Sequence, residues 1–232
     1  MGISNIIMIK RISFISDTHN QHESITRFLS GGDILIHAGD ATGRGTLPEL
    51  TQFFKWFDSL DYTHKILIAG NHDWGFQKDP NLYKKVLEDY PSITYLQDSF
   101  TIIDGIKIYG SPWQPEFFNW AFNLPRSGED LREKWFWIPN DTDILITHGP
   151  PKGYGDYVHR DNLNVGCELL LERIKEVKPT FHVCGHIHLG HGHIYEHGVN
   201  FINASVLDDN YYPAFGPYQF DWNVETGDLT NL

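Results

Sequence analysis

Short apolar runs rich in β-branched residues recur five times along the chain, and each ends at a group of acid, amide or histidine side chains. They cover residues 12–16, 34–38, 65–69, 143–147 and 181–184. Runs of this length and composition predict buried β-strands. In open α/β sheets ligands bind at the carboxyl ends of the strands, so the pattern predicts a ligand site where these five strands end.

Between the predicted strands, apolar residues recur at helical spacing. Residues 52–60, 80–90 and 167–177 are predicted to form amphipathic helices. Hairpin-like pieces are predicted for residues 93–109 and 192–220. This order of elements predicts an α/β fold in which two packed sheets are flanked by helices. No repeat, linker or low-complexity tract is visible, so residues 1–232 are expected to form one domain.

Polar clusters follow the five predicted strands, and histidine occurs in four of them. The clusters are Asp17-Thr18-His19, Gly39-Asp40, Gly70-Asn71-His72-Asp73, Thr147-His148-Gly149 and Gly185-His186-Ile187-His188. Turn chemistry explains glycine, asparagine and aspartate after a strand, but it does not explain the histidines. Two divalent cations about 3.5–4 Å apart need a bridging carboxylate together with imidazole and oxygen donors. The clusters therefore predict a dinuclear metal site.

The order of the clusters is DxH, GD, GNH followed by an acid, H and GHxH, and it resembles the calcineurin-like metallophosphoesterase superfamily. Residues 68–72, 108–113, 122–126, 147–151 and 202–205 further resemble its brain-type metallophosphodiesterase (MPPED) branch. The similarity extends from about residue 12 to about residue 220. The resemblance implies a four-layer αββα sandwich, in which two mixed β-sheets are flanked by helices.

The resemblance also implies seven metal ligands, divided between two divalent ions. One ion would be held by Asp17, His19 and His188, the other by Asn71, His148 and His186, with Asp40 as the bridge. A carboxylate has enough lone pairs to serve two cations, whereas a neutral imidazole serves one. Sites of mixed His, Asp and Asn accept Mn, Fe, Zn, Co or Ni, and of these we favour Mn.

Three further residues are candidates for catalysis. The resemblance implies that His72 binds no metal and instead protonates the leaving oxygen or contacts the phosphate. Asp73 could orient the His72 ring or raise its basicity, or it could serve as a turn or helix-cap carboxylate. Arg44 stands at the offset of the phosphate-binding arginine in the related motif GDxxDRG. Because Gly43 replaces the aspartate of that motif, a solvated loop arginine is the alternative.

Composition narrows the possible partners and location. The formal net charge of −12 argues against a broad surface for long nucleic acids, so small phosphodiesters fit better as substrates. Without a run of about 18 apolar residues, no membrane span is expected. Residues 1–10 predict a first strand rather than a signal peptide. Two cysteines are too few for a disulfide framework, which favours a reduced, cytoplasmic protein; the oligomeric state is left open.

Residues 111–137 are irregular and rich in aromatic side chains. Such a loop can be a lid that stacks on a base or an aryl ester. It can equally be a satellite core under a long loop, or an interface. His191, His193 and His197 follow the last polar cluster. We expect them to be structural or to support the ligands from behind, because other residues already supply the metal ligands.

Two classes of function are compatible with these residues. The first is a metal-dependent phosphoesterase that hydrolyses small phosphodiesters, with cyclic nucleotides among the candidates, through a metal-activated hydroxide. Within this class a phosphomonoesterase or a nuclease is the alternative. The second class is a binding scaffold without catalysis. Scaffold members of the superfamily usually lose ligands or the catalytic histidine, and because both are present here, we predict a phosphodiesterase.

Overall fold

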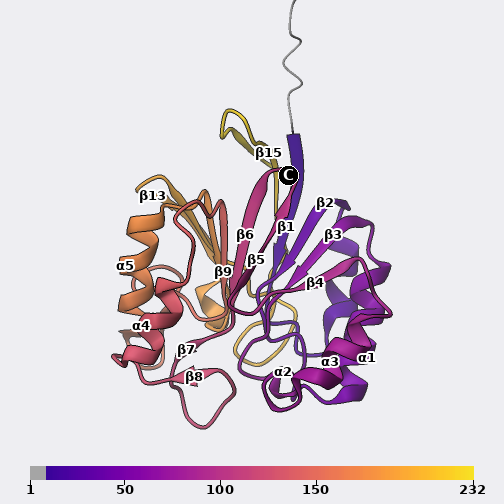
Figure 1. The fold of residues 1–232 in the computed structure, drawn as a ribbon, viewed down its shortest axis with the longest axis horizontal. Helices are drawn as coiled ribbons and strands as arrows, with labels where there is room; N and C mark the ends of the chain where they lie inside the picture. Colours follow the sequence, from indigo (N-terminus) through magenta and orange to yellow (C-terminus); the bar gives the residue numbers. More distant parts are fainter. Residues whose placement is uncertain (1–8) are drawn as a thin grey trace, which may run out of the picture.

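The computed structural model describes residues 9–232, which form two six-stranded β-sheets packed face to face (Figure 1). Helices from the first half of the chain cover the outer face of one sheet, and helices from the second half cover the other (Figure 1). The predicted sandwich of two mixed sheets flanked by helices is confirmed. The strand predicted for residues 1–10 lies outside the described residues, except that Ile9 and Lys10 open the first strand.

The first sheet is built around four parallel strands that follow one another in the chain. Its strands, in spatial order, are β16 (Leu229–Asn231), β15 (Tyr218–Asn223), β1 (Ile9–Ile15), β2 (Gly32–His37), β3 (Tyr62–Leu67) and β4 (Ile93–Tyr95). β1 to β4 are parallel, whereas β15 pairs antiparallel with β1 and with β16. Parallel pairing turns the carboxyl ends of β1, β2 and β3 toward the same edge.

The second sheet also has a parallel centre, with an antiparallel strand at each edge. Its strands, in spatial order, are β13 (Gly192–Glu196), β14 (Val199–Asn203), β12 (Phe181–Cys184), β9 (Ile144–Thr147), β6 (Ile106–Ser111) and β5 (Ser99–Ile103). Two short pairs lie outside the large sheets: β7 (Gln114–Pro115) with β8 (Asn123–Leu124), and β10 (Tyr157–Val158) with β11 (Leu163–Asn164).

Each region predicted to be a hairpin is divided between the two sheets. In residues 93–109 only β5 and β6 form a hairpin, whereas β4 pairs parallel with β3 in the first sheet. In residues 192–220, β13 and β14 form a hairpin, and β15 crosses over to pair with β1. The prediction was wrong at β4 and β15 because an apolar strand pattern does not specify which sheet the strand joins.

The helices are α1 (Leu47–Ser59), α2 (Trp74–Lys78), α3 (Pro80–Leu87), α4 (Glu129–Phe136) and α5 (Glu168–Val177), with short 3-10 turns η1 (His22–Phe28) and η2 (His188–Gly190). Three of the helices, α1, α3 and α5, form close to where the sequence predicts them, whereas α2 was not predicted and α4 lies within the segment 111–137 that was expected to be irregular. α1 begins at Leu47 rather than at residue 52. The Glu49 carboxylate accepts hydrogen bonds from the backbone N–H and the hydroxyl of Thr46, at 2.9 and 2.7 Å, and this capping box adds the first turns.

Apolar layers hold the sheets and helices together. Between the two sheets, the rings of Phe14, Phe181 and Phe220 pack with centroids 5.2–6.0 Å apart. On the outer face of the first sheet, α1 buries Phe53 and Phe57, whose rings are stacked at 5.1 Å. A third layer lies between the second sheet and α4 and α5. With strands fixed on both sides, the loops at the sheet edge are held in defined positions.

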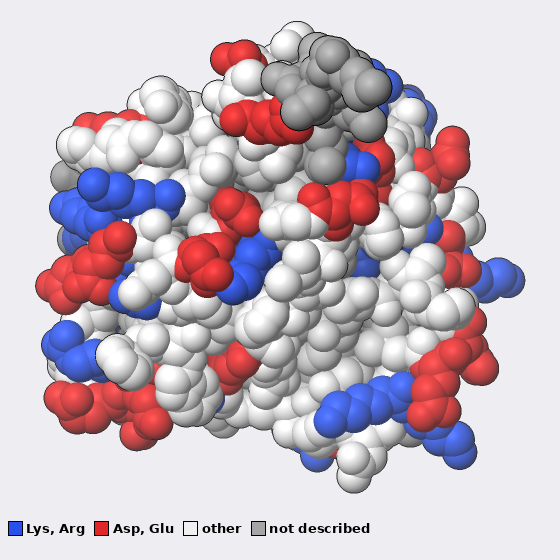
Figure 2. Space-filling model, turned by 45° about the horizontal axis from the view of Figure 1, so that its top comes forward, with Lys and Arg blue, Asp and Glu red and all other residues white. Residues whose placement is uncertain are grey.

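Acidic and basic side chains are interspersed on the surface. On the face shown in Figure 2 they alternate in small groups rather than gathering into one broad basic patch. Within residues 9–232, no helix is long and apolar enough to cross a membrane. Cys167 and Cys184 are both buried and form no disulfide.

Candidate metal centre

The carboxyl ends of β1, β2, β3, β9 and β12 meet at the lower edge of the two sheets in Figure 1. The loops after these strands bring all seven predicted ligands into one region. The ligands are Asp17, His19, Asp40, Asn71, His148, His186 and His188. Most of these side chains are buried, which makes their mutual contacts the main determinant of their chemistry.

Asp17, His19 and His188 form a first group, whose ligand atoms lie within 4.8 Å of one another. The Nε2 atoms of His188 and His19 lie 3.5 and 3.9 Å from Oδ1 of Asp17. The Nδ1 of His188 donates to the carbonyl of Asp208 at 2.8 Å. This bond fixes the ring and leaves Nε2 free for a cation. The group has the three residues predicted for one ion.

Asp40, His148 and His186 form a second group of the same size. The Nε2 of His148 lies 3.3 Å from Oδ2 of Asp40 and 3.1 Å from Oδ1 of Asn71. The Nδ1 of His148 donates to the carbonyl of Ala38 at 2.9 Å, so this ring also presents Nε2. The structure thus brings together the residues predicted for the second ion.

Asp40 lies between the two groups. Its Oδ2 is 3.6 Å from Nε2 of His19 and 3.3 Å from Nε2 of His148. Its Oδ1 accepts the backbone N–H of His72 at 2.8 Å, which holds the carboxylate in this orientation. One carboxylate oxygen therefore faces an imidazole of each group, the position that a ligand shared by two cations requires.

A further observation, on the ring nitrogens of His19, shows that these side chains suit divalent cations. Both ring nitrogens of His19 are buried, and neither has a hydrogen-bond partner within residues 9–232. An unpaired buried polar group costs about 1–3 kcal/mol, and the buried carboxylates of Asp17 and Asp40 need positive charge beside them, which His188 and His148 supply here. Bound cations would satisfy both, since they accept the imidazole lone pair and neutralise the carboxylates.

The backbone at the ligands is strained. Asp17, His19, Asp40 and His186 all have positive φ, at 55°, 40°, 54° and 67°. Such conformations cost about 1 kcal/mol or more for residues other than glycine, and they cluster at functional sites. Hydrogen bonds across the loops hold them, for example from the Asp17 N–H to the carbonyl of Gly39 at 3.0 Å. The strained backbone positions are therefore those that orient the ligand side chains.

Two glycines allow the loops to approach the ligands. A Cβ at Gly185 would lie 2.0 Å from Oδ2 of Asp17, and one at Gly70 would lie 2.2 Å from Oδ1 of Asp40. Neither distance is possible for a real side chain. These glycines are therefore required by the close approach of backbone to carboxylate.

The charges within the centre are strongly coupled. Burial lowers the pKa of His148 and of His188, but the carboxylates of Asp40 and Asp17 outweigh it and raise each pKa to about 9. Burial lowers the pKa of His19 to about 4, despite the same carboxylates. Burial alone would raise the pKa of Asp17, yet its contacts with His188 keep it below the usual value. Cation binding must displace the protons on His148 and His188.

His72 lies beside the two groups, with a ring nitrogen within 4.8 Å of ligand atoms of His19 and Asp40. Its Nδ1 donates to the carbonyl of Gly43 at 3.0 Å, which leaves Nε2 for another partner. The indole of Trp120 stacks on the ring, with centroids 4.2 Å apart and planes inclined by 24°. The imidazole is thus fixed from two sides.

Asp73 does not contact the His72 ring. It is buried, and its two oxygens accept the backbone N–H groups of Ala41, Thr42 and Gly70 at 3.2, 3.0 and 2.9 Å. The Thr42 hydroxyl donates at 2.7 Å. Burial, followed by the charge of Asp40, raises the pKa of Asp73 to about 6. Asp73 therefore joins the loop after β2 to the loop after β3 and orients the ligands through the backbone.

Replacing Asp73 with asparagine is expected to destabilise the protein by about 2–4 kcal/mol, because an NH₂ group would face backbone N–H donors that now have an acceptor. Denaturant unfolding of the two proteins measures this loss. Asp89→Asn, which changes an exposed carboxylate on the surface, is the matched control and should shift stability by less than about 0.5 kcal/mol. Equal stability of Asp73→Asn and the unaltered protein would contradict the assigned role.

Arg44 is exposed, and its guanidinium forms no ion pair within residues 9–232. Its neighbour Gly43 supplies the carbonyl that holds His72, so the backbone of Arg44 lies close to the metal centre. A cation left unpaired in this position is available to a phosphate. Its predicted role in phosphate binding stays a prediction.

Two residues beside the centre were not predicted from the sequence. The ring of Tyr211 lies 4.8 Å from the ring of His19 and 5.2 Å from that of His188, and its backbone has φ of 62°. Gln114 donates its amide to Oδ1 of the ligand Asn71 at 3.3 Å. Neither carries a local signal, because both approach from segments remote in the sequence, Gln114 from β7 and Tyr211 from the loop before β15. A bulky residue at positive φ signals function only once the structure is known.

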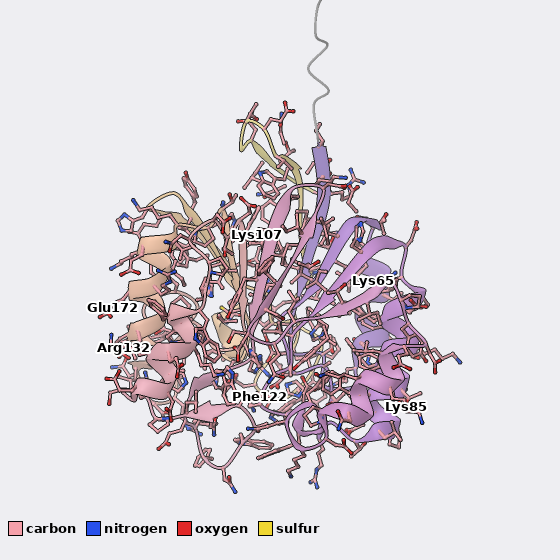
Figure 3. All side chains as sticks on the ribbon, viewed as in Figure 1. Lys65, Lys85, Lys107, Phe122, Arg132 and Glu172 are labelled. Carbon is pink, nitrogen blue, oxygen red and sulfur yellow. The ribbon has the colours of Figure 1, made fainter. Side chains whose placement is uncertain are left out.

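The aromatic segment of residues 111–137 is divided between the two expected roles. Trp113 belongs to the core: its indole donates to Asp98 at 2.8 Å, and its ring packs on that of Phe122 at 5.4 Å. Phe122, labelled in Figure 3, is fully buried. Trp120 and Phe117 instead lie at the metal centre, on His72 and next to His186. One part of the segment therefore forms a satellite core. The part that carries Phe117 and Trp120, which we call the arch, reaches the metal centre.

The three histidines after the last cluster lie outside both ligand groups. The Nδ1 of His191 donates to the carbonyl of Ser205 at 2.8 Å. The Nε2 of His193 pairs with Oδ1 of Asn200 at 3.0 Å. His197 is exposed at the β13–β14 turn. The first two make contacts that support the second sheet.

The two facing mixed sheets, with a histidine, aspartate and asparagine ligand set at their common edge, define a protein of the metallophosphoesterase fold. The protein TT1561 of Thermus thermophilus has a similar fold, with a TM-score of 0.67 at 15% identity, and the match covers 97% of this chain and 99% of that chain.

Residues 10–190 match the family model described as calcineurin-like phosphoesterase, and the chain belongs to that family. It is 42% identical to metallophosphoesterase domain-containing protein 1 of Homo sapiens, over 91% of this chain and 70% of that protein. It is 37% identical to a UPF0046 protein of Caenorhabditis elegans, over 98% and 86%. The predicted resemblance is confirmed, and the family indicates a phosphoesterase hydrolase that binds divalent metals.

Proposed function

We propose that the chain is a metal-dependent phosphodiesterase that hydrolyses small phosphodiesters, with cyclic nucleotides among the candidates. The observation that carries this proposal is the position of Asp40, whose Oδ2 lies 3.6 Å from His19 Nε2 and 3.3 Å from His148 Nε2. Two divalent cations would supply Lewis acidity at the phosphoryl oxygens and lower the pKa of an attacking water. We favour Mn²⁺ as the identity of these cations.

The chain's own groups would complete the reaction. His72 is held through Nδ1 by Gly43 and on one face by Trp120, so its Nε2 can give a proton to the leaving oxygen. The hydrogen bond from the His72 backbone to Asp40 keeps this proton donor at a fixed distance from the ligands. Such fixed positions lower the entropic part of the barrier.

Charge supports a small diester over a monoester or a long polymer. A monoester dianion needs cationic contacts beyond the metals, and near His72 the described residues offer the unpaired guanidinium of Arg44. The formal net charge of −12 gives little support to the binding of a long polyanion. The two buried cysteines without a disulfide support a reducing, cytoplasmic location.

The proposal is tested by the hydrolysis of matched esters after loading with Mn²⁺. The kcat/KM for bis(4-nitrophenyl) phosphate is expected to exceed that for 4-nitrophenyl phosphate, and a chelator should abolish both activities. Cyclic nucleotides and single-stranded DNA complete the comparison. A higher kcat/KM for the monoester or for DNA would overturn the assignment to small diesters. Two bound ions without hydrolysis of any ester would point to a scaffold.

A further inference from the structure

A cavity of about 230 Å³ opens directly beside the second ligand group. His186 forms part of its wall, and the other walls come from the β7 segment and from the loops after β9 and β11. Its lining is mostly apolar, with contributions from Pro115, Phe117, Pro150, Val158, Val165 and Ile187. Pockets for drug-sized ligands span about 300–1,000 Å³, so this one accommodates a single ring system.

Phe117 forms the wall nearest to the metal centre. Its ring centroid lies 5.9 Å from that of His186, in an edge-on orientation. The side chain is 47% exposed, so one face is open to a ligand. Asn123 donates its amide to the carbonyls of Phe117 and Phe118, both at 3.1 Å, and this fixes the arch that carries the ring. The aromatic wall is therefore preformed.

Gln114 lines the same cavity, and its side chain carries an unsatisfied acceptor. Its amide nitrogen donates to Oδ1 of Asn71 and to Oδ1 of Asn123, at 3.3 and 3.2 Å. Its Oε1 is buried and has no hydrogen-bond partner within residues 9–232. A buried acceptor without a donor is costly, so a ligand that brings an N–H or O–H group to it gains free energy.

The charged groups that line the cavity, among the described residues, are Arg126 and Arg160, which already have acceptors, and the carboxylates of Glu116 and Asp161. Arg126 donates to the carbonyl of Gly166 at 2.8 Å and to the carboxylate of Glu168 at 3.1 Å. Arg160 is paired with the neighbouring Asp161 at 3.0 Å. Both arginines are thus already engaged. The cavity favours a neutral ligand over a further phosphate or carboxylate.

We propose that this cavity binds the second ester group of the substrate as a neutral, planar aromatic ring that carries an N–H or O–H donor. The ring lies against Phe117, and its donor reaches Oε1 of Gln114. This inference rests on the proposed function, because a second ester group exists only in a diester. It goes further than the proposed function because it says where the second ester group binds, that this group is planar and that it is neutral.

Binding of two phosphinates tests the site separately from hydrolysis. Diphenylphosphinate and dimethylphosphinate carry the same single charge and cannot be hydrolysed, and they differ only in their rings. By calorimetry on the Mn²⁺-loaded protein, the diphenyl compound is expected to bind at least about tenfold tighter. Phe117→Ala should reduce this preference by about five- to tenfold. Phe136→Ala, on an exposed phenylalanine of α4, is the matched control and should leave it unchanged.

Hydrolysis provides the second measurement. Phenyl 4-nitrophenyl phosphate and methyl 4-nitrophenyl phosphate share the same leaving group, so any difference in KM reports on the retained arm. The KM should be lower for the phenyl ester, and Phe117→Ala should remove that difference while kcat changes little. Hydrolysis without a ring preference, or a preference that survives Phe117→Ala, would overturn the subsite and leave the proposed function intact. Ring-dependent binding without hydrolysis would support the subsite and reject the proposed function.

The role of Gln114 Oε1 as an acceptor is tested with substrates whose retained phenyl ring carries an amino group. The 3-aminophenyl and 4-aminophenyl esters are compared with the phenyl ester, and at least one is expected to have a KM about two- to tenfold lower. Gln114→Met should abolish this gain and retain the preference for phenyl over methyl, at equal metal content. No gain from either amino group would reject the assigned role of Gln114.

Discussion

Replacing Asp40 with asparagine is expected to lower kcat by at least about 10³-fold and to reduce the number of bound divalent ions per chain. The amide keeps the size of the side chain but removes its charge. The Oδ2 that now faces both His19 and His148 would no longer offset two cations. Because Asp40 also accepts the His72 backbone N–H, an amide nitrogen at that position would further disturb the proton donor.

Elemental analysis together with steady-state kinetics measures both effects. Asp141→Asn serves as the control, because Asp141 is exposed and pairs with Lys107 on the surface. It should retain activity and two ions. Full activity of Asp40→Asn, or unchanged metal content at limiting Mn²⁺, would exclude Asp40 as the shared ligand.

Replacing His72 with alanine is expected to cut kcat by about 10²–10⁴-fold while the metal content stays the same. We expect the imidazole to transfer a proton rather than to bind a cation. Its Nδ1 is committed to Gly43 and Trp120 covers one face, so Nε2 is the nitrogen free for this role. The loss should shrink for 4-nitrophenolate as leaving group, because this anion needs little protonation. Alkyl esters, with poor leaving groups, should show the full effect.

The dependence on the leaving group separates a proton donor from a structural residue. His197→Ala is the matched control, since this exposed histidine lies outside the ligand groups and should not affect kcat. Loss of metal together with activity in His72→Ala would move His72 into the ligand set. An equal loss for aryl and alkyl esters would reject general acid catalysis and leave phosphate contact as its role.

Most of the candidate ligands could be read from the sequence because their position depends on local features. Asp17 follows β1 and His148 follows β9, and an apolar run ended by a polar cluster identifies both strand and turn without knowledge of the fold. Once the strands are parallel, their carboxyl ends meet at one edge. The same reasoning also gave α3 and α5 close to their observed limits.

The contacts that other side chains make could not be predicted in this way. Asp73 looks from the sequence like a partner of His72 or a helix cap. It does stand at the N-cap of α2, but its carboxylate makes no capping hydrogen bond and instead accepts N–H groups from the loop after β2. Trp113 and Trp120 belong to one aromatic segment, but one supports the core and the other stacks on His72. An aromatic residue has the same local pattern in both settings, and only its neighbours in space distinguish them.

The order of the motifs in the sequence carried the resemblance to the family. The sequence by itself also determined the strands that end in ligands and the residue types that can hold divalent cations, because these depend on hydrophobic periodicity and on the chemistry of single side chains, which are local properties. Only the tertiary structure decided that β4 and β15 join the first sheet, that Tyr211 and Trp120 cover the centre, and that Gln114, with its unpaired acceptor, lines a cavity beside His186. Such contacts join segments far apart in the chain, and they form because packing places those segments side by side.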